Sequence, residues 1–373
     1  MNNDKSKSND VSKGADALED NRTSEPDHEL IRPVYGKDAP LELIEEALKY
    51  AKGFMEKPDI FLYTGDSNSH PVFPDFADLE HVIERVTINI QRMHHYYKNS
   101  VWVTSMIGNN DATPSYYMDI PGEGEEISTI VKIAGAWKDT ITDKDMKQFK
   151  LHGYVAYPVD NRLVVITLNT AVYSIYHEPR SLNLDDPLGQ FKWLKDELKE
   201  MKRRNQVAFL CGHIPPSLDS HVEENQWKVE YIEMYKEIIK DYSDIIRAQL
   251  FGHLHRNEVR FSPDGNLPPL FITTALSPRY NNNPAFIVWE YDPTSYELCD
   301  FVLHGTDIND KEPYYNWKAL FRATKAYNLM DLSSKSWKSW ATEIENDFKM
   351  IEKYRWYSKA QSPLVLVVYE RRL

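Results

Sequence analysis

Apolar residues recur at helical spacing in two stretches near the start of the chain, Leu41–Phe54 and Leu79–Tyr97. Pro40 precedes the first stretch, and proline is common where a helix begins. Two more helices are predicted at residues 186–204 and 225–242. Shorter apolar runs that end in turn residues predict strands at residues 60–63, 101–107, 163–168, 207–211, 248–251, 258–261, 270–274 and 285–291.

The rest of the chain has a weaker pattern. Residues 112–150 are predicted to be irregular, and the segment from Tyr314 onward is aromatic-rich and predicted mostly helical, with a final strand-like run at 364–369. Strands and helices thus alternate first, and strands dominate the second half before the helical end. This order predicts an α/β sandwich with helices on the outside.

Composition and charge narrow the possible functions. Of the 373 residues, 42% are apolar and 27% are charged, which is ordinary for a folded chain. The formal net charge of −13 gives no electrostatic support for binding nucleic acid or an anionic membrane. No run of about 18 apolar residues predicts a transmembrane segment. Cys211 and Cys299 are the only cysteines, so we expect no disulfide framework. We also expect a monomer.

Residues 1–32 form a predicted disordered tail rich in Ser, Asn, Asp and Lys. It has no apolar core of the kind that a secretory signal needs. If this N-terminus is complete, the sequence predicts a cytoplasmic protein.

Four of the predicted strands are followed by a glycine and then by a polar residue that can bind a metal. These residues are Asp66, Asn109, His213 and His253, and His255 follows two positions later. A glycine lets the backbone turn sharply, and functional loops leave the carboxyl ends of strands in such sheets. Oxygen and imidazole ligands gathered there favour a site for two divalent ions, with Zn, Mn or Fe compatible.

Taken together, these motifs resemble the calcineurin-like metallophosphoesterase superfamily. Further segments resemble its acid sphingomyelinase branch, which includes sphingomyelinase-like phosphodiesterases and endopolyphosphatases: YTGD at 63–66, DPLGQFKWL at 186–194, GHIPP at 212–216 and YNNNPAFIVWEYD at 280–292. The resemblance implies a four-layer α/β/β/α sandwich with a C-terminal, mostly helical subdomain. It divides the chain into the tail at 1–32, a catalytic domain at 33–310 and the aromatic-rich subdomain at 311–373.

The resemblance also implies the metal ligands. Asp66 would bridge two divalent ions, most simply Zn, with Mn or Fe as alternatives. Asn109, His213 and His253 would complete one site, and His255 would bind the other ion.

Other residues gain roles from the same resemblance. His70 would face the phosphate and protonate the leaving oxygen, and Asn281, Asn282 and Asn283 would line the mouth of the cleft. The substrate would be a phosphorylated small molecule, a lipid or polyphosphate. Cleavage of a phosphodiester is the first expectation, and cleavage of a phosphoanhydride is the alternative.

The sequence departs from the family pattern in two places. Family members begin with a strand that ends in Asp-x-His and supplies two metal ligands, whereas here the corresponding segment is the polar tail. The one Asp-x-His, residues 219–221, follows GHIPP instead. We therefore expect a truncated reading of the gene, in which a lost signal segment would imply a secreted, lysosomal or vacuolar protein. The alternative is a catalytically impaired pseudoenzyme that binds phosphorylated ligands.

The second departure is Asn110, which stands where most relatives have histidine. We expect Asn110 to donate a hydrogen bond to the transition state, although an amide cannot transfer a proton at neutral pH. A phosphoanhydride, whose leaving group is better, would tolerate this change more easily than a phosphodiester with an alkoxide leaving group.

Overall fold

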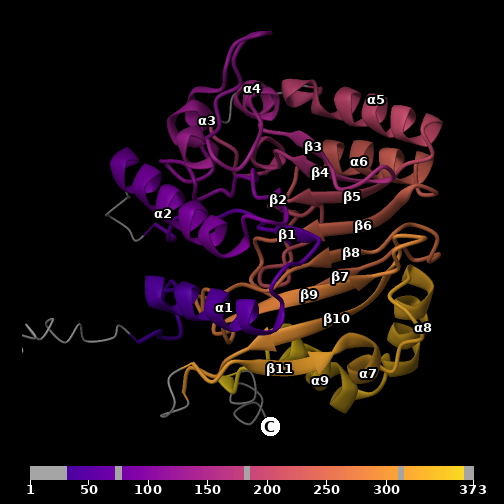
Figure 1. Ribbon diagram of the computed structural model, residues 1–373. Coiled ribbons are helices and arrows are strands. Elements are labelled where there is room, and N and C mark those ends of the chain that lie inside the picture. Colours follow the sequence, from indigo (N-terminus) through magenta and orange to yellow (C-terminus); the bar gives the residue numbers. More distant parts are fainter. Residues whose placement is uncertain (1–31, 72–77, 180–184, 310–314, 365–373) are drawn as a thin grey trace, which may run out of the picture. The chain divides into compact units, whose positions relative to one another are not determined.

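The computed structural model describes residues 32–71, 78–179, 185–309 and 315–364 (Figure 1). Except for Arg32 and Leu364, the predicted tail at 1–32 and the predicted strand at 364–369 lie outside these ranges.

The largest sheet in the described part of the chain has six strands in the order β3-β4-β5-β6-β8-β7. Its four central strands are parallel, and the strands at both edges are antiparallel to their neighbours. Buried, nearly continuous apolar runs form the centre, as expected for parallel strands covered on both faces. The strands are β3 (Val155–Pro158), β4 (Leu163–Leu168), β5 (Val207–Gly212), β6 (Ile246–Phe251), β7 (Glu258–Arg260) and β8 (Leu270–Ile272).

Two smaller sheets lie beside it. One is a parallel pair, β1 (Ile60–Leu62) with β2 (Val101–Val103). The other is antiparallel, in the order β11-β10-β9, and contains β9 (Ala285–Tyr291), β10 (Leu298–Gly305) and β11 (Lys318–Arg322).

Aromatic side chains join the six-stranded sheet to the three-stranded sheet. The ring of Phe271 on β8 lies 5.0 Å from that of Trp289 on β9, and the ring of Phe209 on β5 lies 6.0 Å from that of Tyr291. Two sheets therefore pack face to face through large apolar groups, which is the inner β/β part of the predicted sandwich.

Helices supply the outer layers (Figure 1). α5 packs against β5 and α6, and α7 packs against β10 and β11. α2 buries Val82, Val86, Ile90 and Met93, one helical stripe, and its N-terminus is capped by Asp78, which accepts a hydrogen bond from the His81 N–H. The α-helices are α1 (Leu41–Phe54), α2 (Leu79–Tyr97), α3 (Ser128–Ile133), α4 (Asp143–His152), α5 (Gln190–Arg203), α6 (Val229–Asp241), α7 (Ala323–Tyr327), α8 (Ser334–Ile344) and α9 (Phe348–Ser358).

The α/β sandwich and the helical C-terminal region are as the sequence predicts, and three local predictions are wrong. Residues 112–150 contain α3 and α4 rather than irregular chain. Residues 104–107 are buried but lie beyond β2, because a short buried segment cannot be assigned to a strand or a loop from its sequence pattern alone. β3, β10 and β11 were not predicted, and β11 lies within the segment expected to be helical.

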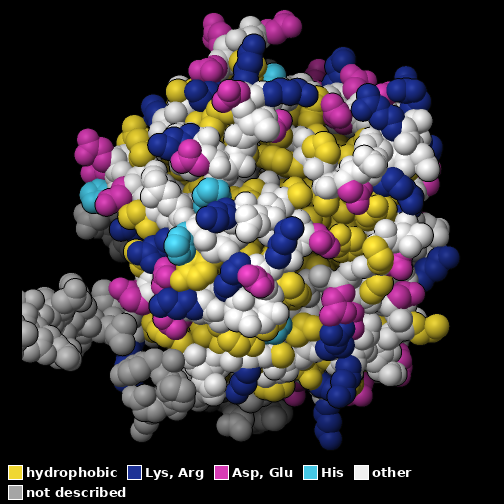
Figure 2. Space-filling model, in the orientation of Figure 1, with side chains coloured by type: hydrophobic (Ala, Val, Ile, Leu, Met, Phe, Trp, Pro, Cys, Tyr) yellow, Lys and Arg dark blue, Asp and Glu magenta, His cyan; other side chains and the backbone are white. Residues whose placement is uncertain are grey.

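Charged side chains of both signs are mixed on the face shown in Figure 2, so that face carries no continuous basic stripe. Within the described residues, no helix combines the length and apolar character needed to cross a membrane.

Candidate metal centre

The candidate ligands lie where strands end. His213 directly follows β5, His253 follows β6 after Gly252, and Asp66 lies four residues after β1. The parallel neighbours β5 and β6 bring their carboxyl ends to one edge of the six-stranded sheet. The loop after β1, from the two-stranded sheet, contacts this edge through the hydrogen bond between His213 and the Thr64 carbonyl. The backbone is in the left-handed region at Asp66 (φ 63°), His253 (φ 73°) and His255 (φ 55°). Such conformations are costly for non-glycine residues and gather at functional sites.

Two glycines let the Asp66 loop and the Asn109 loop touch. Gly65 has a φ of +92°, and a Cβ added there would lie 2.7 Å from the backbone nitrogen of Gly108. A Cβ added at Gly108 would lie only 1.9 Å from the Asp66 carboxylate oxygen Oδ1. These glycines are required because the two loops approach closer than any side chain would allow.

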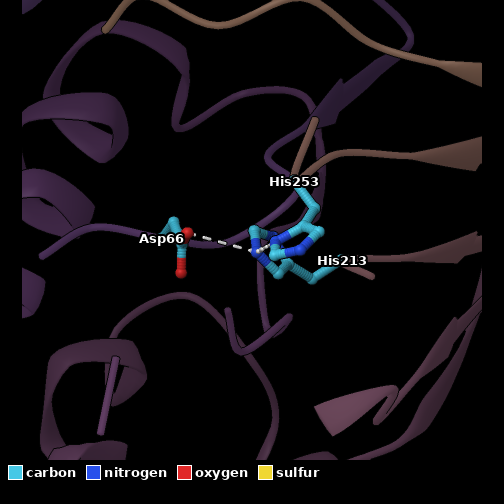
Figure 3. A group of neighbouring side chains, drawn as sticks. All are labelled: Asp66, His213 and His253. Atoms are coloured by element: carbon cyan, nitrogen blue, oxygen red, sulfur yellow. Dashed lines mark hydrogen bonds and ion pairs between the residues drawn. The ribbon is translucent and has the colours of Figure 1, made fainter. Parts of the chain in front are cut away.

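Asp66, His213 and His253 point toward one another (Figure 3), and their candidate ligand atoms all lie within 4.8 Å of one another. The His213 Nε2 atom is central. It lies 3.2 Å from Asp66 Oδ2, 3.1 Å from Asn109 Oδ1 and 3.3 Å from His253 Nδ1. A tetrahedral ion with bonds of about 2.0 Å separates its ligands by about 3.3 Å, so these spacings suit one divalent cation.

The remaining ring nitrogens identify the tautomers. His213 Nδ1 lies 2.7 Å from the Thr64 carbonyl oxygen, and His253 Nε2 lies 2.8 Å from Gln226 Oε1. Both of these nitrogens therefore carry a proton, so His253 Nδ1 is an acceptor, and His213 Nε2 lies between it and two oxygens. A proton or a metal cation at His213 Nε2 satisfies these acceptors, and outer hydrogen bonds of this kind orient metal-binding histidines.

Burial and charge also favour metal binding. Burial lowers the pKa of His253 to about 3 and that of His255 to about 4, so both rings are neutral at pH 7, as a ligand must be. Burial would raise the pKa of Asp66, but His213 and the Asn110 N–H hold it well below its usual range. Burial alone would lower the pKa of His213, but the Asp66 carboxylate, the Thr64 carbonyl and the Asp111 carboxylate together raise it. A bound proton or metal ion at His213 thus offsets the buried negative charge.

His255 and His70 lie beside this group rather than within it. Their rings are 5.3 Å apart, and the Tyr280 ring lies 5.0 Å from His255 and 5.6 Å from His70. His255 is 6% exposed, and its Nδ1 has no hydrogen-bond partner among the described residues. A buried ring nitrogen without a hydrogen-bond partner among the described residues suits a second ion. His255 is, however, not a member of the metal-binding group formed by Asp66, His213 and His253.

His70 is held by Asp38, a residue that the sequence analysis missed. Asp38 Oδ1 lies 2.7 Å from His70 Nδ1, and Asp38 Oδ2 accepts a hydrogen bond from the His70 backbone N–H at 3.1 Å. The Ser277 hydroxyl donates to the same carboxylate. His70 Nε2 is therefore left to face the site from a side chain that is 18% exposed.

Asn110 is buried beneath the site instead of facing a substrate. Its backbone N–H donates to Asp66 Oδ1 at 2.8 Å and its side-chain amide donates to Asp66 Oδ2 at 2.9 Å. Its amide oxygen accepts from the Ser115 hydroxyl. The geometry thus makes Asn110 a positioning residue for Asp66, and we do not propose it as a catalytic residue.

The sequence analysis also assigned no role to Asp111, although this residue lies two positions after the predicted ligand Asn109. Its buried carboxylate accepts backbone hydrogen bonds from Asp66, Ser67, Asn68 and Gly108, which join the two loops. Burial and the neighbouring Asp66 charge raise its pKa to about 6. Its place in the GNND sequence was the one signal that could have identified it.

Two of the three asparagines predicted to line the cleft are buried. Asn282 and Asn283 are 0% and 2% exposed. The Asn282 amide donates to the Ser277 carbonyl, and Asn283 bonds with the Ala360 carbonyl and the Tyr35 hydroxyl. Only Asn281 is exposed. Because burial gives Asn282 and Asn283 a structural role, we do not propose them as substrate contacts.

The out-of-place Asp-x-His does not join the group. His221 Nε2 lies 3.3 Å from the Leu254 carbonyl oxygen and its Nδ1 lies 2.9 Å from the Arg256 guanidinium. A neighbouring cation and two occupied nitrogens make His221 unsuitable as a substitute metal ligand.

A two-sheet sandwich with an aspartate, an asparagine and two histidines gathered beyond its strand ends is the arrangement expected of a metal-dependent hydrolase. The chain matches the calcineurin-like phosphoesterase family over residues 34–257 and the acid sphingomyelin phosphodiesterase C-terminal region over residues 267–363. The chain therefore belongs to the calcineurin-like phosphoesterase family, whose members use divalent metal ions.

Curated relatives agree with this assignment. The chain is 29% identical over 341 residues to a cyclic GMP-AMP phosphodiesterase, SMPDL3A, of Bos taurus, and covers 73% of that protein with 86% of its own length. It is 27% identical to sphingomyelinase phosphodiesterase C of Dictyostelium discoideum, with 88% of this chain and 76% of the relative aligned. It is 26% identical to the acid sphingomyelinase-like phosphodiesterase 3b of Mus musculus, with 86% of this chain and 73% of the relative aligned.

Proposed function

We propose that this chain hydrolyses phosphodiesters at the group formed by Asp66, Asn109, His213 and His253. These four residues would hold one divalent cation, and Asp66 with His255 would contribute to a second. The observation that carries the proposal is the position of His213 Nε2, which lies 3.1–3.3 Å from Asn109 Oδ1, Asp66 Oδ2 and His253 Nδ1. Zn is the ion we propose first, because mixed imidazole and oxygen ligation without cysteine suits it.

Bound divalent cations would neutralise charge on the phosphate oxygens and lower the pKa of an attacking water. The chain's own residues would orient the groups at the site and supply a proton to the leaving oxygen. Asn110 fixes both oxygens of Asp66, while Asp38 fixes the orientation of the His70 ring. His70 Nε2 is placed to donate a proton to the oxygen that leaves phosphorus, because its Nδ1 is already bonded to Asp38.

The substrate class follows from what the relatives share. Their names describe cleavage of a cyclic dinucleotide and of sphingomyelin, and both of these reactions break a phosphodiester bond. We therefore propose an organic phosphodiester rather than polyphosphate as the substrate of this chain.

The first measurement is metal content per chain by elemental analysis, together with the hydrolysis rate of a bis-aryl phosphate ester. We expect bound divalent metal and a rate that a chelator removes. Asp66→Asn should reduce the rate at least 100-fold, because it weakens a carboxylate that faces both proposed ion positions. Asp143→Asn, on the exposed start of α4, is the matched control and should retain the rate.

Different results would overturn separate parts of the proposal. Full activity in Asp66→Asn would show that the ligand assignment is wrong. Metal binding with no cleavage of any phosphodiester would favour the pseudoenzyme alternative. Faster release of phosphate from polyphosphate than from phosphodiesters would replace the proposed substrate class by phosphoanhydrides.

A further inference from the structure

Tyr280 joins the metal centre to a second group of polar side chains. On the side of the centre, its ring lies 5.6 Å from the His70 ring and 5.0 Å from the His255 ring. The same ring lies 4.9 Å from the His221 ring. His221 is exposed and Tyr280 is 39% exposed, so this second group is open to solvent. A ligand held at the metal centre can therefore extend past one aromatic ring to reach it.

Two cationic side chains belong to this second group. Arg256 Nη2 donates to His221 Nδ1 at 2.9 Å, and Arg256 Nη1 donates to the Ser220 hydroxyl at 3.1 Å. Lys359 Nζ donates to the Tyr280 carbonyl oxygen at 2.9 Å. Arg256 lies in the loop after β6, whereas Lys359 caps the end of α9. The fold thus brings together two cations that are far apart in the sequence.

Two carboxylates lie near these cations, and both have other partners. Glu258 Oε1 is 3.6 Å from Arg256 Nη1, while Glu258 Oε2 is 2.7 Å from Arg260 Nη2. Asp219 Oδ1 accepts a hydrogen bond from the His221 backbone N–H at 2.6 Å. Glu258 is thus shared between two arginines, and Asp219 is occupied by the backbone. The positive charge of the group is therefore only partly offset.

The ammonium of Lys359 is the least compensated of these charges. In the described part of the chain its hydrogen-bond partner is the Tyr280 carbonyl, and it forms no ion pair there. Burial and the neighbouring Arg256 charge lower the pKa of Lys359 to about 8. A half-buried ammonium beside a second cation is destabilising unless an anion binds to it.

We propose that Lys359 and Arg256 form an anion site that holds a second phosphate group of the substrate. This inference rests on the proposed phosphodiesterase function, and it narrows the substrate to an organic phosphodiester that carries a further phosphate. An ammonium has three donors, of which the Tyr280 carbonyl takes one, so Lys359 can still bind phosphate oxygens. His221 orients the Arg256 guanidinium, which adds positive charge beside the phosphate.

The same charges disfavour a cationic group on the substrate. A choline phosphodiester would bring a quaternary ammonium close to Lys359 and Arg256, and like charges at short range reduce affinity. The chain as a whole has a formal net charge of −13, so it does not attract anions in general. The local pair of cations therefore selects substrates by the charge of the group next to the cleaved phosphodiester.

Backbone hydrogen bonds hold the end of α9 in place without the Lys359 side chain. The Lys359 carbonyl accepts from the Asn283 N–H at 3.1 Å, and the Ser358 carbonyl accepts from the Asn257 N–H at 2.8 Å. A substitution at Lys359 keeps both of these bonds. Its side chain can therefore be changed without displacing the segment that carries it.

The test compares cleavage of the internal phosphodiester in thymidylyl-thymidine (TpT) with that in pTpT and TpTp, which carry one more phosphate. In the wild type we expect kcat/KM for a phosphorylated form to exceed that for TpT about 10- to 100-fold, mainly through KM. Lys359→Gln should remove most of this preference, and Lys359→Arg, which keeps a cation, should retain it. Lys353→Gln is the matched control, because this exposed lysine of α9 lies over the Tyr357 ring.

Binding of inorganic phosphate to the metal-depleted protein gives a second readout, which does not depend on cleavage. With a chelator present, no metal ion can hold the phosphate. We expect calorimetry to detect weak binding whose affinity falls about tenfold in Lys359→Gln. The affinity of Lys353→Gln should equal that of the wild type.

Each outcome decides the proposal. A preference for phosphorylated dinucleotides and phosphate binding that both depend on Lys359 support it. Phosphate binding without that preference would mean that free phosphate, and not the substrate, occupies the site, which overturns the proposal. An equal loss for TpT, pTpT and TpTp in Lys359→Gln would assign a purely structural role to this lysine. Cleavage of TpT with no effect of Lys359 would refute the anion site alone, whereas absence of any cleavage by the wild type would refute the proposed function.

Discussion

At the residue scale, the ligand nitrogens are selected by hydrogen bonds on the far side of each ring. The Thr64 carbonyl accepts from His213 and the Gln226 amide oxygen accepts from His253. Without these partners each ring could rotate or exchange its tautomer, and the bare nitrogen would no longer face the other ligands. The chemistry of the centre thus depends on residues that bind no metal themselves.

Gln226→Leu tests this dependence. The leucine keeps the bulk of a side chain that is 2% exposed but removes the acceptor for His253 Nε2. We expect metal affinity to fall 10- to 100-fold, the usual effect of losing such a partner. Titration of the metal-depleted wild type and variant with Zn measures this change in affinity. Gln206→Leu removes an exposed hydrogen bond to the Asn161 carbonyl and should leave the affinity unchanged; equal losses in both variants would contradict the prediction.

The proposed role of His70 predicts a dependence on the leaving group. His70→Ala should lower kcat 10²- to 10⁴-fold for a phosphodiester with an alkyl leaving group, because the departing alkoxide needs a proton. It should lower kcat much less for an aryl ester, whose leaving group needs no such help. Comparing the two substrates in wild type and variant measures the difference. A similar loss for both would assign His70 to substrate binding instead.

At the scale of elements, the centre depends on contact between the loop after β1 and the loop that contains Asn109. Gly65 and Gly108 allow the two loops to approach closely. The Asp111 carboxylate stabilises this contact by accepting hydrogen bonds from four backbone N–H groups of the two loops. Because both loops leave strands that pair with each other, a shift of either loop moves Asp66 relative to Asn109.

Gly108→Ala should therefore disable the centre without unfolding the protein. The new methyl group would lie 1.9 Å from Asp66 Oδ1 and 2.4 Å from the Asp66 backbone nitrogen, so both the carboxylate and the local backbone of the Asp66 loop must move. We expect at least tenfold weaker Zn binding with an unchanged circular dichroism spectrum. Gly135→Ala is the matched control, since no atom lies within 4 Å of its added Cβ. Normal Zn affinity in Gly108→Ala would show that Asp66 is not confined as described.

At the scale of the whole molecule, His304 joins α1 to the three-stranded sheet. Its ring stacks on Phe54 and Phe286 at 4.6 and 5.3 Å, and its Nδ1 lies 3.0 Å from the Tyr50 hydroxyl. Burial lowers the pKa of His304 to about 4. The unfolded chain binds a proton at this histidine near pH 6.5, whereas the folded chain does not until about pH 4.

This difference predicts that acid destabilises the fold through His304. Between pH 6.5 and 4 the unfolded state binds more protons, so the free energy of unfolding falls as the pH falls. The contribution is up to about 3 kcal/mol, at 1.36 kcal/mol per pKa unit. His304→Phe keeps the stacking and should reduce this pH dependence, as measured by urea unfolding at pH 7, 5.5 and 4.5. The same slope in wild type and variant would contradict the assignment.

Local pattern was sufficient to predict much of the fold and to pick out residues that the structure brings together. Strands followed by glycine marked Asp66, Asn109, His213 and His253, and the carboxyl ends of the β1-β2 pair and of β5 and β6 bring these residues together. The bounds of α1 and α2 followed from helical spacing, with a proline at the start of α1. These features are encoded within a few residues of one another, so the sequence alone could determine them.

Partners distant in the sequence required the tertiary structure. Asp38 holds His70 from 32 residues away, and Gln226 holds His253 from 27 residues away. No local pattern marks either one, because their roles depend on which loops the sheets bring together. The same applies to Asn282 and Asn283, which resemble an exposed turn but lie buried against Ser277 and Ala360. The sequence thus determined which residues follow the strands, and only the packing of the sheets decided which atoms meet.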